Sequence, residues 1–313
     1  MLKITVIIPV YNAEAFLRKA VESALQFDEV KEIILIEDKS TDNSLEICKK
    51  LTAEHSEIHL YQHPDKKNHG AGASRNLGLK KASHDFIAFL DADDYYLPNR
   101  FEAEKELFKN PETEGVFGAM GTEFLSAKGK LEFEKKFRNT QLTTVNYHAE
   151  GKDIFYGLLG LDRSFGSFFP LNCLTVRSES IRKDGVRFNE NLRVHQDSDF
   201  IIKLAFHCHL KSGNITEPIA IRGVHDNNRI TKITRYSQQY NQRQLLLWKS
   251  LYEWSLDKKI KKEYQEHLFL NKKAFELAHK KGLKKYISLL RTVIKNPNIL
   301  KTRYRFTYTH HEA

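Results

Sequence analysis

The segment FIAFLDADDYYLP, residues 86–98, joins a short, mostly apolar run to three aspartates within four positions. Such a run is typical of a strand that is buried on both faces of a parallel sheet. Ligands of open parallel sheets bind beyond the carboxyl ends of the strands, where Asp91, Asp93 and Asp94 fall. Neighbouring carboxylates repel one another unless a cation lies among them, which favours a site for Mg²⁺ or Mn²⁺. A solvated turn before Pro98 is the alternative that this segment leaves open.

Three further strand-like runs precede this segment, and a helix-like stretch follows each of them. The runs are ITVIIPV (4–10), EIILIE (32–37) and IHLYQH (58–63), and the third helix opens with the Gly-rich turn HGAGASRN (69–76). Strands that alternate with helices predict βαβ units and a mostly parallel sheet, and thus an α/β fold. Downstream we expect a strand at 115–125, a helix at 197–209 and only helices after about residue 236.

Basic residues are concentrated in the C-terminal part of the 313-residue chain, whose formal net charge is +10. Residues 231–313 contain 19 basic residues (Lys and Arg) and 6 acidic residues (Asp and Glu). Residues 1–230 contain 31 basic and 34 acidic residues. We therefore predict an α/β domain over 1–230 and a basic, mainly helical extension over 231–313. Charge asymmetry of this kind indicates an anionic partner, either a nucleic acid or a membrane surface.

Polar side chains also follow the other predicted strands. Pro9, Tyr11 and Asn12 close the first strand, and Asp38 follows the second. Asp38 could accept the imide N–H of a uracil ring, and Tyr11 could pack against the base. Arg75, in the Gly-rich turn, could bind a phosphate or brace a carboxylate. A plain turn before a capped helix explains Asp38 as well.

In order and spacing, the segments VIIPVYNAE, IEDKSTDNS and GAGASRNLGLKKASHDFIAFLDADDYYLPNR resemble the family 2 glycosyltransferases with a GT-A fold. The resemblance is strong over residues 3–110 and continues more thinly to about 230. It implies a Rossmann-like, mostly parallel sheet flanked by helices. It also implies an inverting transfer of a sugar from a nucleotide-diphosphate donor, most often a UDP-sugar, with Mn²⁺ or Mg²⁺ as cofactor.

The resemblance further implies roles for individual residues. Asp93 would bind the metal, and His225 would bind the metal or touch the diphosphate, although a structural histidine is the alternative. Arg222 and Arg229 could neutralise phosphate. The predicted nucleotide-binding residues are Pro9, Tyr11, Asn12, Glu14, Asp38, Arg75, Asp91 and Ala92.

Inversion needs a general base that takes the proton of the acceptor hydroxyl. The segment RVHQDSDFIIKLA (193–205) resembles the family's Glu-Asp pair at the start of a helix, with Gln196 in the position of the glutamate. We predict Asp197 as the base and Asp199 as the second candidate. Helix geometry points the two side chains in different directions, so only one should face the site. Capping of the helix by both is the structural alternative.

Residues 279–295, HKKGLKKYISLLRTVIK, have the pattern of a basic amphipathic helix. Its apolar face is formed by Leu283, Tyr286, Ile287, Leu290, Val293 and Ile294. Such a helix suits an anionic membrane surface, and packing against the catalytic domain is the alternative. The resemblance to enzymes of lipid-linked polysaccharide biosynthesis favours the membrane, with a glycan or lipid-linked acceptor at the inner face of the plasma membrane. No motif for nucleic acid binding accompanies the basic residues.

The cysteines Cys48, Cys173 and Cys208 are too few and too widely spaced for a disulfide framework, which favours a reducing, cytoplasmic setting. No apolar run approaches the roughly 20 residues that span a bilayer, and we expect no signal peptide.

Three other functions fit parts of the pattern. A nucleotidyltransferase should have a Gly-rich loop after its first strand, but VYNAEAF lacks glycine. An aspartate-dependent phosphatase usually has its DxD on the first strand. A sugar-nucleotide-binding protein that has lost catalysis is suggested only by Gln196.

Overall fold

The computed structural model describes residues 2–137, 141–166, 168–226 and 236–309, which form two units. The α/β unit comprises Met1–Arg193 and Phe200–Asn228, and the helical unit comprises Val194–Asp199 and Arg229–Ala313. The predicted domain boundary at residue 230 lies outside the described residues and stays a prediction.

The α/β unit is built on a seven-stranded sheet with the order β3-β2-β1-β4-β8-β6-β9. The strands are β1 (Ile4–Val10), β2 (Val30–Glu37), β3 (Ile58–Gln62), β4 (Phe86–Phe89), β6 (Gly115–Phe117), β8 (Leu174–Arg177) and β9 (Leu210–Ser212). The first four strands run parallel, whereas β8 is antiparallel to both β4 and β6. The predicted α/β fold with a mostly parallel sheet is confirmed, and the carboxyl ends of β1, β2 and β4 meet at one edge.

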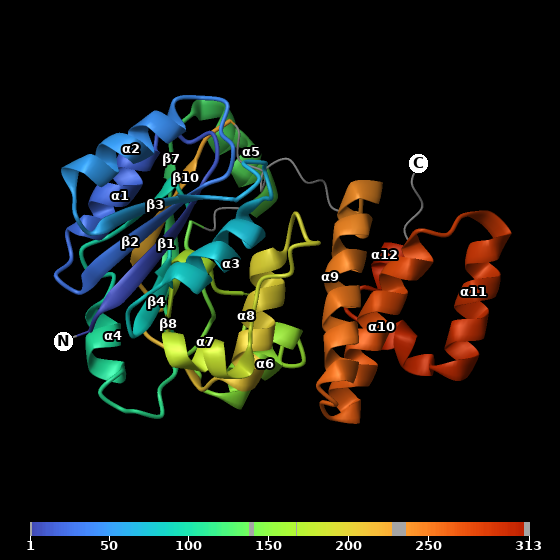
Figure 1. The fold of residues 1–313 in the computed structure, drawn as a ribbon. Helices are drawn as coiled ribbons and strands as arrows, with labels where there is room; N and C mark the ends of the chain where they lie inside the picture. Colours follow the sequence, from blue (N-terminus) through green and yellow to red (C-terminus); the bar gives the residue numbers. More distant parts are fainter. Residues whose placement is uncertain (1, 138–140, 167, 227–235, 310–313) are drawn as a thin grey trace. The chain divides into compact units, whose positions relative to one another are not determined.

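Three helices connect the first four strands: α1 (Leu17–Leu25), α2 (Ser44–Glu54) and α3 (Ala71–Lys81). Right-handed crossovers lead outward from β1 to β3 and then back across to β4. Helices α1 and α2 therefore cover one face of the sheet and α3 covers the other (Figure 1). The hydrophobic core includes the apolar side chains of β1, which is central in this sheet and buried along almost its whole length.

The predicted strand at 115–125 is two strands that belong to different sheets. Strand β6 ends at Phe117, and β7 (Ala119–Phe124) pairs with β10 (Pro218–Val224) and, through it, with β5 (Asp94–Tyr96) in a three-stranded sheet. Gly118 lies at the switch, where a Cβ atom would come within 2.8 Å of the Asn214 carbonyl oxygen. The chain can change sheets here because glycine permits this close approach.

The remaining helices of the α/β unit are α4 (Glu102–Leu107), α5 (Ala127–Phe137), α6 (Lys152–Leu159) and α7 (Ser178–Asp184). Helix α8 (Gln196–His207) forms close to its predicted range, and its first turn belongs to the helical unit.

The helical unit contains α9 (Gln238–Asp257), α10 (Lys262–Ala278), α11 (Gly282–Lys295) and α12 (Arg305–Thr309), so the expected C-terminal helices are present. Helix α11 ends at Lys295, and Pro297 opens a 3₁₀ turn, Pro297–Lys301. A core of five buried residues holds the unit together: Leu270, Ala274, Leu277, Ile299 and Tyr308. Among the described residues, no helix combines the length and the apolar character needed to cross a bilayer.

A buried ion pair lies under β8. Arg100 and Glu104, one turn apart, form a salt bridge, and the hydroxyl of Thr175 donates to Glu104 Oε1 at 3.0 Å. Both charged side chains are fully buried, and the Arg100 guanidinium lies 4.8 Å from the Tyr96 ring centre and 4.6 Å from that of Phe101. Burial raises the pKa of the Glu104 carboxyl, and the positive charge of Arg100 opposes this shift.

We expect Arg100→Met to lower the free energy of unfolding by about 3–5 kcal/mol, because it leaves a buried carboxylate without its partner. The double variant Arg100→Met/Glu104→Leu should recover most of this loss, since it removes both charges. Urea unfolding followed by circular dichroism measures both effects. A double variant that is no more stable than the single one would contradict the coupling.

Candidate functional site

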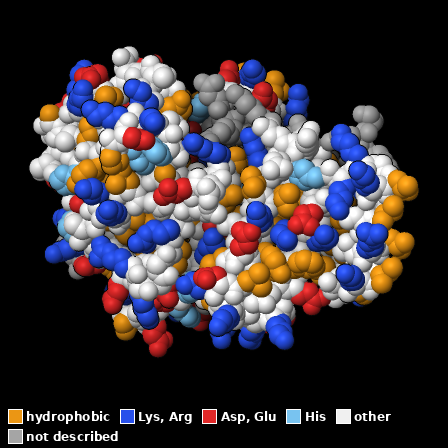
Figure 2. Space-filling model, turned by 45° about the vertical axis from the view of Figure 1, so that its right-hand side comes forward, with side chains coloured by type: hydrophobic (Ala, Val, Ile, Leu, Met, Phe, Trp, Pro, Cys, Tyr) orange, Lys and Arg blue, Asp and Glu red, His pale blue; other side chains and the backbone are white. Residues whose placement is uncertain are grey.

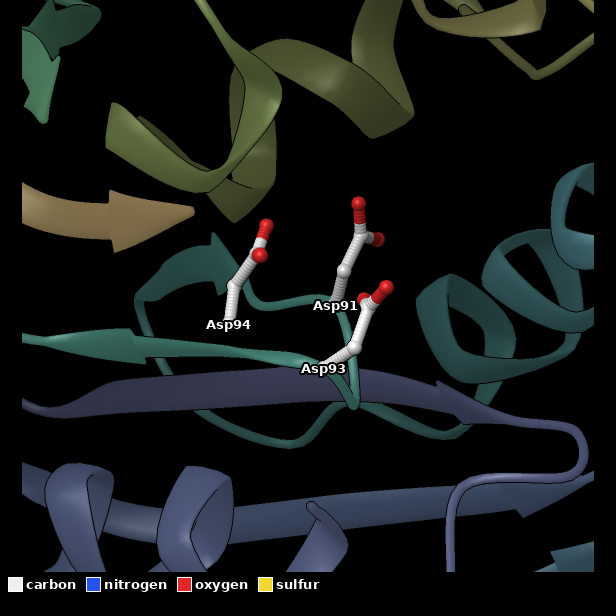
Figure 3. Close-up of side chains that lie close together, drawn as sticks. All are labelled: Asp91, Asp93 and Asp94. Carbon is white, nitrogen blue, oxygen red and sulfur yellow. The ribbon is translucent and has the colours of Figure 1, made fainter. Parts of the chain in front are cut away.

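Three aspartates converge just beyond the carboxyl end of β4. Oxygen atoms of Asp91, Asp93 and Asp94 all lie within 4.8 Å of one another, and the carboxylates point to the same side of the chain (Figure 3). Burial, together with the charges of Asp93 and Asp91, raises the pKa of Asp94 well above its ordinary value. The carboxylates of the cluster repel one another, and a divalent cation would neutralise their negative charge. Their oxygens are also the hard donors that such a cation prefers.

His225 lies next to this cluster, and the role of metal ligand that the family resemblance implies for it stays a prediction. Its Nε2 atom is 3.2 Å from Asp93 Oδ2, although the two residues are 132 positions apart. His225 follows β10, and its ring stacks on Phe16 with the ring centres 4.6 Å apart. A carboxylate and an imidazole so close together, beside further carboxylates, form a donor set that suits Mn²⁺ or Mg²⁺.

Both oxygens of the Asp94 carboxylate have protein donors. The Gly223 amide donates to Oδ1 at 3.0 Å, and Asn172 Nδ2 donates to Oδ2 at 2.5 Å. Gly223 also packs so closely that a Cβ atom would lie 2.5 Å from the Asp93 carbonyl oxygen. Asp94 therefore fixes the end of β10, and with it His225, against the aspartate segment. The sequence reasoning missed Asn172 and Gly223, and its one available signal was a glycine within an apolar strand.

Arg75 braces Asp91, which is one of the two roles that the sequence left open. The buried guanidinium donates through Nη2 to Asp91 Oδ1 and lies 5.5 Å from the ring centre of Phe188. Its Nε atom is buried and has no hydrogen-bond partner among the described residues. Arg75 thus orients the carboxylate of Asp91, which is partly exposed.

Asp38 anchors the Gly-rich turn that precedes α3. Its buried carboxylate accepts the backbone N–H of His69 and of Gly70, each at 2.7 Å, and its carbonyl oxygen accepts from Asn68 Nδ2 at 2.8 Å. Each carboxylate oxygen retains a second lone pair. A bond to the base of a nucleotide remains a prediction. The structural role that the carboxylate has is to hold the turn before α3, and not the turn before α2 that the sequence left open.

Asn12 and Glu14 tie the loop after β1 to the loop after β2. Asn12, whose backbone φ is +50°, accepts the N–H of Thr41 at 2.8 Å through its side-chain oxygen. Glu14 Oε2 accepts the N–H of Asn43 at 2.9 Å and its Nδ2 at 3.0 Å. These side chains shape the sheet edge through protein contacts, and their predicted contacts to a nucleotide are untested.

The other predicted nucleotide-binding residues differ in exposure. Tyr11 is half-exposed at the same edge, where its ring is open to a stacking partner. Pro9 is partly buried in β1, and Ala92 is buried between Asp91 and Asp93. Arg222 of β10 lies opposite Asp94 of β5 in the register of the two strands. Arg229 lies outside the described residues.

The two candidates for the base have different surroundings at the start of α8. Asp199 is fully buried, and the hydroxyl of Ser250 donates to its Oδ1 at 2.7 Å. Asp197 is partly exposed, and its Oδ1 accepts the adjacent Ser198 N–H at 2.9 Å. Asp199 is therefore held by a contact to α9, whereas Asp197 is accessible to solvent.

Residues 5–156 match the family model described as glycosyl transferase family 2. An uncharacterized glycosyltransferase of Rickettsia felis is 27% identical over 93% of this chain and 45% of its own length. The chain thus spans less than half the length of the curated relatives that it matches first.

Two solved structures share the fold. S. aureus TarS 1–349 in complex with UDP-GlcNAc has a TM-score of 0.60, 15% identity, and coverage of 95% of this chain and 81% of that one. The mannosyltransferase PcManGT from Pyrobaculum calidifontis, in complex with GDP-Man and Mn²⁺, has a TM-score of 0.51 and 15% identity, with coverage of 98% and 83%.

Proposed function

We propose that this chain is a glycosyltransferase that transfers a sugar with inversion from a UDP-sugar. The match of residues 5–156 to glycosyl transferase family 2 supports this proposal. The acceptor that we propose is a hydroxyl of a glycan or of a lipid-linked glycan. The observation that carries this proposal is the convergence of Asp91, Asp93 and His225 beside the edge where β1, β2 and β4 end.

A divalent cation suits this donor set, and we assign it to Asp93 and His225. Bound there, Mn²⁺ or Mg²⁺ would neutralise the charge that develops on the leaving nucleoside diphosphate. Asp94 accepts the Gly223 amide and so holds the end of β10, which precedes His225, beside the segment that carries Asp93. Arg75 orients the neighbouring carboxylate of Asp91. Preorganised ligands of this kind reduce the cost of ordering the site when the donor binds.

Asp197 is the residue that we propose as the general base. Its carboxylate would take the proton of the acceptor hydroxyl as the oxygen attacks the anomeric carbon and the bond to the diphosphate breaks. Asp199 is buried against Ser250, which supports the choice between the two.

Calorimetric titration of UDP and of GDP, each with and without Mn²⁺, tests the donor. We expect UDP to bind in the presence of Mn²⁺ and to lose at least about tenfold in affinity without it, because the cation bridges protein carboxylates and phosphates. If GDP bound more tightly than UDP, the donor would be a GDP-sugar instead of a UDP-sugar. Binding of neither nucleotide would contradict the assignment of this edge to a nucleoside diphosphate.

A further inference from the structure

Helix α11 presents a row of large apolar side chains to solvent. The exposed fractions are 74% for Leu283, 52% for Tyr286, 43% for Ile287, 63% for Leu290 and 74% for Ile294. We call these five residues the outer face of α11. Scattered single hydrophobic residues are ordinary on protein surfaces, but five on one side of a 14-residue helix form a continuous patch.

The opposite side of α11 holds the helix in its own unit. Leu289 and Val293 pack against the core that includes Leu270 and Ile299, and Thr292 is buried beside them. The sequence placed Val293 on the same face as Leu290, which is wrong, because Val293 turns inward with Leu289. Helix α11 is therefore anchored through this inner side, and its outer face is largely exposed.

The charged residues of α11 and of the sequence next to it are all basic. From His279 to His311 the sequence holds nine Lys and Arg and no Asp or Glu. At 100° per residue, Lys284, Arg291 and Lys295 fall on one flank of the outer face. Figure 2 shows hydrophobic side chains along the edge that α11 forms, with Lys and Arg beside them.

We propose that the outer face of α11 binds the surface of an anionic lipid bilayer, with the helix axis in the plane of the interface. The apolar row would enter the boundary between headgroups and acyl chains, and the basic flank would contact anionic headgroups. A nucleic acid would match the charge but would leave the apolar row exposed. A second copy of the chain would match the apolar row, but an antiparallel two-fold contact would bring like-charged flanks together.

Sedimentation of the intact chain with vesicles tests this proposal. We expect binding to vesicles of equal parts phosphatidylglycerol and phosphatidylcholine, and little binding to phosphatidylcholine alone. The variant Leu290→Gln/Ile294→Gln should bind about tenfold more weakly or worse, because two apolar side chains no longer favour insertion. The variant Lys284→Gln/Arg291→Gln/Lys295→Gln should lose most of its preference for the anionic vesicles.

Matched controls separate the surface from general effects of polarity and charge. Leu131→Gln/Leu256→Gln replaces two exposed leucines on α5 and α9 and should bind as the unmodified chain does. Lys49→Gln/Lys109→Gln/Lys249→Gln removes the same charge from exposed lysines elsewhere and should keep most of the preference. Circular dichroism confirms that each variant is folded.

Three results would overturn the proposal. Equal binding to neutral and anionic vesicles would remove the role of the basic flank. If Leu290→Gln/Ile294→Gln bound vesicles as well as Leu131→Gln/Leu256→Gln does, the outer face would not be the surface that inserts into the bilayer. Self-association in light scattering that Leu290→Gln/Ile294→Gln abolishes, without any binding to vesicles, would assign the face to a second copy of the chain.

Discussion

Replacing Asp93 by asparagine should abolish the dependence of UDP binding on Mn²⁺ and reduce kcat/KM for sugar transfer by more than about 100-fold. The amide keeps the size of the side chain but removes the charge that faces His225 Nε2 at 3.2 Å. A hard divalent cation loses most of its affinity when a carboxylate ligand becomes a neutral amide. Calorimetry with UDP and a transfer assay with the active UDP-sugar measure the two effects.

The chain offers a close control at the other end of the same strand. Asp85 is exposed and immediately precedes β4, so Asp85→Asn removes the same charge at the amino end of the sheet. We expect this variant to bind UDP and to transfer sugar as the unmodified chain does. If Asp93→Asn retains metal-dependent UDP binding within about threefold of the control, the cation lies elsewhere.

The position of the aspartate cluster could be predicted because it follows from local pattern and topology alone. Continuous apolar runs separated by helices imply parallel strands, and parallel strands bring their carboxyl ends to one edge. The contact between Asp93 and His225 could not follow from such a pattern. It depends on the pairing of β10 with β5, which joins segments more than 120 residues apart, and only the family resemblance indicated it.

Hydrogen-bond partners within loops were also beyond the sequence reasoning. The family resemblance implied contacts of Asn12, Glu14 and Asp38 with a nucleotide. In the structure each of them also accepts a backbone N–H from a neighbouring loop. Short polar side chains serve equally well as loop braces and as ligand contacts, because the same acceptors fit both. The break at Gly118 was missed for a related reason, since the residues on both sides of it favour a strand.

Asp197→Asn should leave UDP binding unchanged and lower kcat for sugar transfer by about 10²–10⁴-fold, the usual contribution of a general base. An asparagine cannot take the proton of the acceptor hydroxyl, but it keeps the size of the side chain at the start of α8. The partly exposed position of Asp197 makes a loss of folding unexpected. Calorimetry with UDP and Mn²⁺, together with the initial rate of transfer, separates binding from chemistry.

Asp199→Asn is the comparison for Asp197→Asn, because we expect it to lower the stability of the fold and not the rate of sugar transfer. The buried Asp199 accepts a hydrogen bond from Ser250, and its replacement should lower the free energy of unfolding by about 1–3 kcal/mol while the folded fraction keeps most of its kcat. The opposite result, a folded Asp199→Asn variant without turnover and an active Asp197→Asn variant, would make Asp199 the base.

An unmodified chain that binds UDP with Mn²⁺ but transfers none of the UDP-sugars tested to any acceptor would favour the binding protein that Gln196 suggested. In that case neither aspartate would have a catalytic role to lose.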